Sequence, residues 1–275
     1  MRLGAPVDQT SSPEAWIQAL QKQGYRAAYC PIDASADSTL RRAYLQAAQQ
    51  ADIVIAEVGA WSNPISPDET VRQEALRKCQ DQLALADEIG ACCCVNIAGS
   101  RALQWDGPDP QNLTEETFDL IVETTRLILD AVKPRRTFYT LEPMPYLYPE
   151  SISTYESLIR AVERPQFGVH LDPVNWVNSV ERYYYNGELI REAFARLGKY
   201  IKSCHLKDIR LEPHLTLHLN EVIPGTGTLD YAALLTCAAQ APVDLPLMLE
   251  HLPMGDYPQA AAFVRQKAAS LGLSL

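Results

Sequence analysis

The chain has 275 residues, 47% hydrophobic and 21% charged, which is ordinary globular usage and long enough for a large buried core. Its net charge is −10, and because an acidic chain repels phosphate backbones, nucleic acid is not an expected partner. No window approaches the roughly 20 apolar residues of a membrane span, so no membrane association is expected.

Apolar runs alternate with helix signals along the first half of the chain. Ser12-Pro13-Glu14 opens the first helix with a hydroxyl cap, a proline in the first turn and an acid near the positive end, and Gly24 ends it. Asp37 and Ser66-Pro67-Asp68 mark two further helix starts. The pattern predicts strands over residues 1–7, 25–30, 52–58 and 91–97, and helices over residues 12–24, 38–50, 67–89 and 114–133.

The second half repeats this alternation with sharper strand ends. Pro143 and Pro173 each follow an apolar run directly, and proline cannot continue a central strand. The pattern predicts strands over residues 137–142, 167–172, 200–206 and 245–250, and helices over residues 151–163, 188–197, 230–240 and 257–271. Residues 211–229 are expected to form a long loop that closes on Pro224-Gly225-Thr226-Gly227.

Eight predicted strands alternating with helices indicate the fold class. Buried runs separated by helices imply a parallel sheet, and eight such units in about 250 residues match an α/β protein of the (β/α)8 TIM barrel type. No composition break marks a linker, so a single domain over residues 1–275 is expected. An open doubly wound sheet is the alternative, but no strand leads into a Gly-x-Gly-x-x-Gly phosphate turn.

The cysteines indicate the redox environment. Seven are present without a Cys-x-x-Cys pair, and three of them, Cys92, Cys93 and Cys94, are consecutive in an apolar run. Adjacent strand residues face opposite ways, which disfavours a shared metal site there. The first nine residues hold no apolar stretch of signal-peptide length. Reduced, buried thiols in a cytoplasmic protein are therefore expected.

Four ionisable residues close the last four predicted strands: Glu142, Asp172, His205 and Glu250. Active sites of such barrels lie at the C-terminal ends of the strands, so the four should meet there. Three carboxylates brought together in a core raise one another's pKa and need a counter-charge, which a divalent cation supplies. This mostly hard oxygen set favours Mn²⁺ or Mg²⁺, with Co²⁺ or Zn²⁺ as alternatives.

The seventh predicted strand carries a polar face. Ser203, His205 and Lys207 alternate along it, and alternate residues of a strand share one face. Such a face suits the mouth of a barrel, although a half-exposed strand with a solvated face has the same pattern. Lys207 is expected to point inward beside His205, either as a substrate contact or as the salt-bridge partner of a neighbouring acid.

Several motifs resemble those of the xylose isomerase-like TIM-barrel superfamily, which includes sugar phosphate isomerases/epimerases, ketose 3-epimerases, inosose dehydratases and endonuclease IV. They are Leu-Glu-Pro at Glu142, Leu-Asp-Pro at Asp172, His-Leu-Lys-Asp at His205, Leu-Glu-His at Glu250, and Pro-Gly-Thr-Gly-Thr-Leu-Asp over residues 224–230. The resemblance to the ketose 3-epimerases implies one Mn²⁺ bound by Glu142, Asp172, His205 and Glu250. It also implies that Glu142 and Glu250 are the catalytic acid/base pair.

Two carboxylates and a cation suit the epimerisation of a sugar next to its carbonyl group. Removing a proton next to a carbonyl and returning it to the other face needs two bases and a Lewis acid for the enediolate. The chain departs from the epimerases at Asn175, where they carry a histidine three residues after the metal aspartate; asparagine can bind a hydroxyl but cannot titrate near pH 7. The run from His205 to Arg210 also resembles the inosose dehydratases, where Lys207 would assist loss of water.

Further substrate contacts are expected around the mouth. Glu57, Trp61 and Asn96 end or follow the third and fourth strands, and Trp61 suits stacking on a sugar ring, or filling space under a loop. Arg210 lies near the position where the epimerases keep a substrate-binding arginine, with a surface-loop arginine as the alternative.

Other polar and aromatic residues are expected not to bind the metal or the substrate directly. His170, two residues before Asp172, is expected to be a hydrogen-bonded core histidine beneath the site. His251 has the opposite parity to Glu250 and is expected to point away from it. Tyr183, Tyr184 and Tyr185 are consecutive and are candidates for a lid or a homo-oligomer contact.

The sequence thus predicts an enzyme with a small carbohydrate substrate. The leading hypothesis is a metal-dependent isomerase or epimerase acting on a sugar or sugar phosphate. The alternative is a metal-dependent lyase or dehydratase acting on a keto-polyol or keto-glycoside with the same metal and bases. A non-catalytic partner subunit is disfavoured because all four ligand candidates are present, and DNA repair is disfavoured because the histidines of a three-zinc site are missing.

Overall fold

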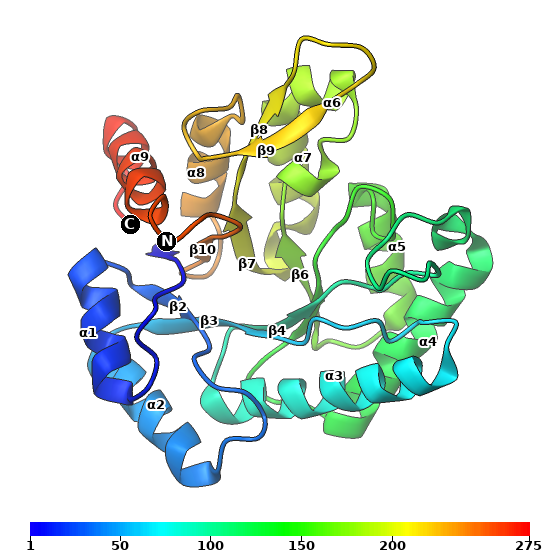
Figure 1. Ribbon diagram of the computed structural model, residues 1–275, viewed down its shortest axis with the longest axis horizontal. Helices are drawn as coiled ribbons and strands as arrows, with labels where there is room; N and C mark the ends of the chain where they lie inside the picture. Colours follow the sequence, from blue (N-terminus) through cyan, green and yellow to red (C-terminus); the bar gives the residue numbers. More distant parts are fainter.

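A computed structural model describes residues 1–275 and shows a closed barrel of parallel strands surrounded by helices (Figure 1). The strands follow one another around the barrel in chain order, and β10 closes it by pairing with β1. The expected single-domain TIM barrel is therefore confirmed. The barrel strands are β1 (Arg2–Gly4), β2 (Ala27–Tyr29), β3 (Val54–Gly59), β4 (Cys93–Asn96), β5 (Tyr139–Leu141), β6 (Phe167–Leu171), β7 (Ile201–Leu206) and β10 (Pro246–Leu249).

Eight of the nine helices lie within two residues of the predicted ranges, and the remaining one, over residues 180–184, was not predicted. The hydroxyl of Ser12 accepts the N–H of Ala15, and Gly24 ends the first helix with a φ of 67°, a conformation that glycine adopts without strain. No helix is long and apolar enough to span a membrane. The helices are α1 (Pro13–Gln23), α2 (Ser38–Gln50), α3 (Glu69–Ile89), α4 (Glu115–Val132), α5 (Ile152–Val162), α6 (Val180–Tyr184), α7 (Asn186–Leu197), α8 (Tyr231–Ala239) and α9 (Tyr257–Ser270), with short 3₁₀ turns η1 (Pro110–Leu113), η2 (Val174–Trp176) and η3 (Gly198–Tyr200).

One continuous core of 60 buried residues fills the barrel and the space between the strands and the helices. Trp16 of α1 and Tyr44 of α2 meet edge to face at 5.5 Å within it. All seven cysteines are free, as expected, and Cys93 and Cys94 are fully buried. The barrel is therefore a packed scaffold that can hold strand-end side chains rigidly.

Residues 208–222 differ from the expected loop. Only Lys207 separates the end of β7 from β8 (Asp208–Leu211), which pairs antiparallel with β9 (Leu219–Val222). The prediction of a continuous loop from residue 211 was wrong because two four-residue strands of mixed polarity carry little periodic signal. The β8–β9 ribbon projects beyond the C-terminal end of β7 (Figure 1).

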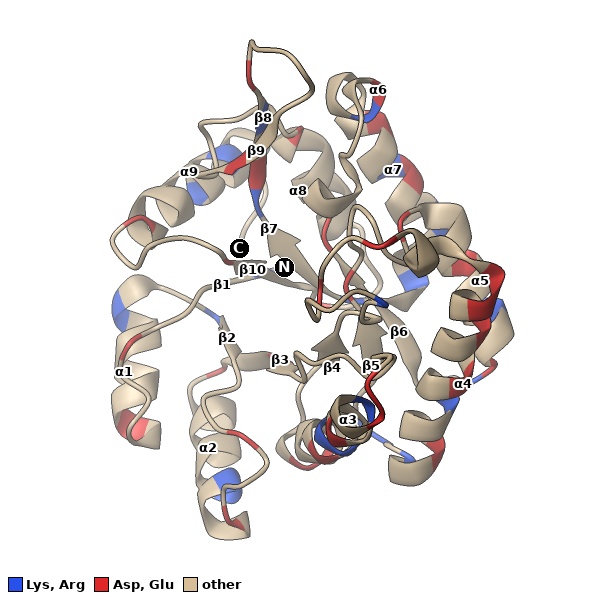
Figure 2. Cartoon of the chain, turned by 45° about the vertical axis from the view of Figure 1, so that its right-hand side comes forward, with Lys and Arg blue, Asp and Glu red and all other residues tan.

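Charged side chains divide between the outer helices and the strand ends. Figure 2 shows acidic and basic residues along the outward faces of α3, α4, α5 and α7, with others at the barrel mouth and on the ribbon. In a parallel barrel every strand ends on the same side, so the loops that follow the strands share one face. That face holds the candidate site.

Candidate active site

A cavity of about 530 Å³ opens at the C-terminal ends of the strands, within the roughly 300–1,000 Å³ typical of small-molecule sites. Its walls include Glu142 after β5, Lys207 after β7 and Glu250 after β10. A smaller concavity of about 410 Å³ lies on the outer surface beside α5 and α7 and contains none of the strand-end residues. The mouth of the barrel is therefore the candidate active site.

The ionisable residues that close four strands converge at the base of this cavity. Glu142, Asp172, His205 and Glu250 each offer one ligand atom, and these atoms lie within 4.8 Å of one another. Nδ1 of His205 is 2.7 Å from Oε1 of Glu250 and 3.3 Å from Oε1 of Glu142. The side chains of His205 and Asp172 have no exposed surface, whereas that of Glu250 is 13% exposed. Glu250 thus lies nearest the opening.

Lys207 points inward beside His205, and its ammonium lies among the carboxylates. Its Nζ is 2.6 Å from Oε1 of Glu250, 2.7 Å from Oδ2 of Asp172 and 3.6 Å from Oε1 of Glu142. The side chain is 1% exposed. A buried ammonium needs such partners, because burying an unpaired charge is costly.

The close packing of charges shifts their pKa values in opposite directions. Burial raises the pKa of Glu142, and the neighbouring Glu250 adds to this. Burial also opposes ionisation of Glu250, but the charges of His205 and Lys207 outweigh it and lower its pKa to about 2. For His205 and Lys207 burial opposes the charged form, yet the surrounding carboxylates raise both pKa values well above their usual range. The two carboxylates flanking the site therefore sit in different environments.

The residues present fit one divalent cation. Oδ2 of Asp172 and Oε1 of Glu250 both face Nζ of Lys207, at 2.7 and 2.6 Å. The place between these two carboxylates thus already accommodates a positive charge, and a divalent cation would suit the same surroundings because it offsets the repulsion among the three buried acids. Three carboxylates and one imidazole nitrogen form a donor set suited to Mn²⁺, Mg²⁺ or Zn²⁺.

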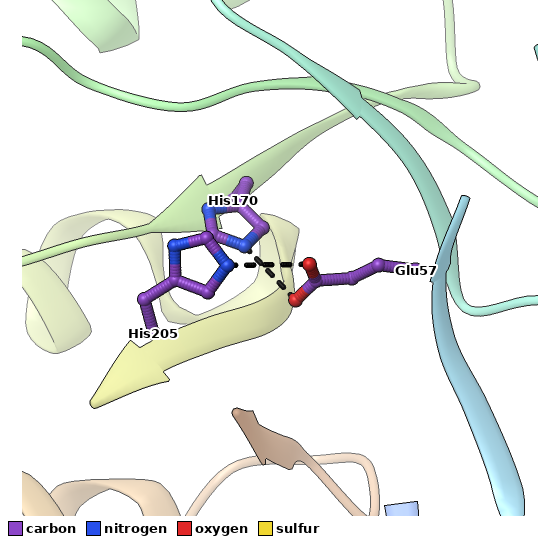
Figure 3. Close-up of side chains that lie close together, drawn as sticks. All are labelled: Glu57, His170 and His205. Carbon is purple, nitrogen blue, oxygen red and sulfur yellow. Dashed lines mark hydrogen bonds and ion pairs between the residues drawn. The ribbon is translucent and has the colours of Figure 1, made fainter. Parts of the chain in front are cut away.

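A second buried cluster consists of Glu57, His170 and His205 (Figure 3). Glu57 of β3 points toward His170 of β6 and His205 of β7, with Oε1 3.0 Å from Nε2 of His170 and Oε2 3.2 Å from Nε2 of His205. The hydroxyl of Ser203 also donates to Glu57. Burial opposes ionisation of Glu57, but the charges of the two histidines outweigh it and hold its pKa below the usual range. His170 is thus the hydrogen-bonded core histidine that the sequence predicts.

The structure differs from expectation at three residues placed around the mouth, none of which lines the cavity. Glu57 lies one layer too deep because β3 continues for two residues beyond it. Asn96 turns toward α3, where its amide accepts from the N–H of Ser62 and contacts Cys79. Arg210 lies on the ribbon and pairs with Glu212 at 2.9 Å, outside the cavity.

Trp61, Asn175 and Lys207 do line the cavity. Nδ2 of Asn175 donates to Oε1 of Glu142 and to the carbonyl oxygen of Pro143, each at 3.0 Å. Asn175 therefore orients a carboxylate in addition to facing the cavity. The tyrosines at 183–185 lie outside it.

Several wall residues were missed from the sequence. Glu221 lies on β9, inside the stretch expected to be a loop, and Trp105 lies in the long connection after β4. Tyr29 and Tyr257 end β2 and begin α9, and Tyr29 could have been found by applying the strand-end rule to the second strand.

His251 also lines the cavity, contrary to the parity argument. The strand ends at Leu249, and His251 has a φ of 57°, so strand alternation no longer decides where its side chain points. Its Nδ1 is 3.2 Å from Oε2 of Glu221, which joins the ribbon to the loop after β10.

Asp208, the last residue of the His-Leu-Lys-Asp motif, holds the ribbon in place. It is 1% exposed, and its carboxylate accepts the backbone N–H groups of Ile209, Gly225, Gly227 and Leu229 at 2.8–3.0 Å. A Cβ on Gly227 would meet Oδ1 of Asp208 at 2.3 Å, so only glycine allows this approach. The two sequence motifs are thus one structural unit.

The chain belongs to the xylose isomerase-like TIM barrel family, whose sequence model matches residues 17–267. The fold and the strand-end cluster described above agree with that membership. No curated protein matches the chain.

Solved structures share the fold at low sequence identity. A xylose isomerase domain protein from Planctomyces limnophilus is 19% identical, with a TM-score of 0.64 over 98% of this chain and 93% of that one. The probable 3-DHS dehydratase AsbF from Bacillus anthracis is 15% identical, with a TM-score of 0.71 over 98% and 99%. The 3-keto-D-glucoside 4-epimerase YcjR from E. coli is 14% identical, with a TM-score of 0.69 over 97% and 99%.

Proposed function

We propose that this protein is a divalent-metal-dependent isomerase or epimerase that moves a proton next to the carbonyl group of a sugar. The convergence of Glu142, Asp172, His205 and Glu250 carries the proposal. The family and its epimerase and dehydratase neighbours support an enzyme of this general class. A related barrel from Mycobacterium smegmatis is described in complex with magnesium.

Glu142 and Glu250 are the proposed acid/base pair. Glu142 follows β5 and Glu250 follows β10, and β6 and β7 lie between those strands, so the two carboxylates approach the cavity from different sides. Both line it, and so both can reach a bound ligand. A base removes the proton and an acid returns it, and two groups on opposite sides allow return to the other face.

Asp172 and His205 are the proposed pure ligands, because neither lines the cavity. A divalent cation bound by these two residues together with Glu142 and Glu250 would supply a Lewis acid for the charge that develops beside the carbonyl. Mn²⁺ is the proposed ion, and Mg²⁺ has the same preference for oxygen donors.

A lyase acting on a keto-polyol or keto-glycoside is the second candidate, and the position of Lys207 favours it. A dehydratase begins with the same proton abstraction and then protonates a departing hydroxyl. Lys207 lines the cavity and lies within 2.6 Å of Glu250, so an ammonium proton is available beside the proposed base.

The experiment is hydrogen exchange from D₂O into ketoses and keto-polyols, followed by NMR with Mn²⁺-loaded protein. Glu142→Gln and Glu250→Gln keep an oxygen ligand but remove the base, so exchange should fall by roughly 10²–10⁴-fold with metal still bound. Glu212→Gln, which follows β8 and lies outside the cavity, is the matched control. If the metal-bound Glu142→Gln variant exchanges hydrogen at the wild-type rate, Glu142 acts only as a metal ligand, and the lyase becomes the better candidate. No exchange into any of the compounds would refute the proposed function.

A further inference from the structure

The charges around the cavity restrict the substrate. We infer that the substrate is an uncharged carbohydrate and not a sugar phosphate or a sugar acid, an inference that rests on the proposed function. Two independent features carry it: the charges of the cavity wall and the glycine loop after β7.

The cavity wall is predominantly acidic. Asp106, Glu142, Glu221 and Glu250 line it, and Lys207 is its single lysine or arginine. Asp172 lies directly beside that lysine, 2.7 Å from its Nζ. Because these five carboxylates face one ammonium and one imidazole, that of His251, a bound divalent cation still leaves the site with a net negative charge. A phosphate or carboxylate on the ligand would meet repulsion at close range.

The cationic groups at the wall already have carboxylate partners. Nζ of Lys207 is 2.6 Å from Glu250 and 2.7 Å from Asp172. The imidazole of His251 is 3.2 Å from Oε2 of Glu221. An anionic ligand would have to break these pairs and leave buried carboxylates unpaired, which is costly.

The loop that could hold a phosphate is filled by the chain itself. TIM barrels frequently bind phosphate with the backbone N–H groups of loops after the seventh and eighth strands. Here Gly225, Gly227 and Leu229, after the seventh barrel strand, donate their N–H groups to the carboxylate of Asp208. An internal carboxylate therefore occupies the donors that a phosphate would use.

The remaining wall suits a neutral ring. Trp61 and Trp105 line the cavity and are 37% and 40% exposed, so they stand at its outer part above the buried carboxylates. The C–H faces of an uncharged sugar can pack on such rings, while its hydroxyls reach the polar base.

The test compares D-fructose and D-tagatose with their 6-phosphates on Mn²⁺-loaded protein. Binding is followed by tryptophan fluorescence and reaction by hydrogen exchange. Each sugar should bind at least about tenfold more tightly than its ester, as one like-charge contact suffices for that factor. Equal or tighter binding of the ester, with exchange, would overturn the inference and leave the proposed function standing. If none of the four compounds exchanges hydrogen, the result counts against the proposed function. The ratio of the affinities for sugar and ester still tests whether the site prefers an uncharged ligand.

Two further measurements test the physical basis directly. Inorganic phosphate, titrated by calorimetry into cation-free protein, should show no saturable binding; saturable binding that a sugar phosphate displaces would overturn the inference. The Asp106→Asn, Glu221→Gln double variant removes two negative charges from the cavity wall. The ratio between the affinities for the sugar and for its phosphate ester should therefore fall by about tenfold. An unchanged ratio would refute the exclusion of the ester by charge.

Discussion

Oε2 of Glu57 lies 3.2 Å from Nε2 of His205, and this contact determines which ring nitrogen faces the carboxylates of Glu142, Asp172 and Glu250. An ionised carboxylate only accepts hydrogen bonds, so Nε2 of His205 must carry a proton. Nδ1 then keeps its lone pair toward Glu142, Asp172 and Glu250 once a cation is bound. Glu57, expected to touch substrate, is better placed to orient a metal ligand.

Glu57→Gln should reverse this arrangement. A glutamine amide can donate to Nε2, which favours the tautomer with hydrogen on Nδ1 and opposes metal binding. We expect Mn²⁺ affinity to fall roughly 10–100-fold with the fold retained. Calorimetric metal titration and ¹⁵N NMR of the His205 ring measure affinity and tautomer separately. Glu212→Gln, outside the cavity, is the control; unchanged affinity with an unchanged tautomer would mean that packing alone orients His205.

The position of Glu57 also shows how far sequence reasoning reaches. Apolar runs and proline stops locate the strands, and the rule that sites lie at strand ends places Glu142, Asp172, His205 and Glu250 together. Depth within a strand depends on where pairing with the neighbouring strand ends, and β3 pairs with β4 as far as Gly59. That pairing is a tertiary property, so the layer occupied by Glu57 could not be predicted.

The ribbon and His251 were missed for a related reason. Glu221 reaches the cavity because β9 pairs with β8, and strands of only four residues are too short for their pattern to indicate a strand. His251 turns inward because its backbone is left-handed, which a parity argument cannot include. The ends of the last four barrel strands were thus predictable, whereas the depth of Glu57 and the residues of the ribbon and of the loop after β10 were not.

Lys207→Met should make the fold depend on bound cation. Removing the ammonium leaves the carboxylates of Asp172 and Glu250 buried without their partner, and breaking a buried pair costs roughly 3–5 kcal/mol. The cation-free variant should unfold at a lower temperature than wild type, and added Mn²⁺ should stabilise it more than it stabilises wild type. Thermal unfolding with chelator and with Mn²⁺ measures both effects.

Lys202→Met is the matched control for this prediction. Lys202 lies on the same strand but faces outward over the ring of Phe138 at 3.9 Å. It should show no difference in cation dependence. If Lys207→Met loses the same stability with and without Mn²⁺, Lys207 contributes packing and does not share oxygens with a cation.

Asp208→Asn should loosen the ribbon and the loop that follows it. The carboxylate accepts hydrogen bonds from four backbone N–H groups. In asparagine an NH₂ group would replace one oxygen and face backbone N–H groups, so that two donors would meet without an acceptor. We expect a loss of roughly 1–3 kcal/mol in unfolding free energy and faster amide exchange over residues 208–229. Asp256→Asn is the control, because Asp256 makes no side-chain capping bond at α9. Equal effects of the two changes would contradict the anchoring role.

Asp172→Asn should separate metal binding from proton transfer. Oδ1 of Asp172 accepts the N–H groups of Val174 and Asn175 at 3.0 and 3.3 Å, so asparagine should keep its oxygen there and turn its NH₂ group toward the cation position. Mn²⁺ affinity should therefore fall more than in Glu142→Gln, at least about tenfold.

Hydrogen exchange measured against Mn²⁺ concentration distinguishes the two roles. Exchange by Asp172→Asn should recover in part when Mn²⁺ is in excess, whereas exchange by Glu142→Gln should not, because the missing base cannot be replaced by metal. Asp106→Asn, at the outer wall of the same cavity, should keep wild-type Mn²⁺ affinity. If Asp172→Asn instead binds Mn²⁺ normally and stays inactive at saturation, Asp172 takes part in proton transfer, and the assignment of Glu142 and Glu250 as the acid/base pair is wrong.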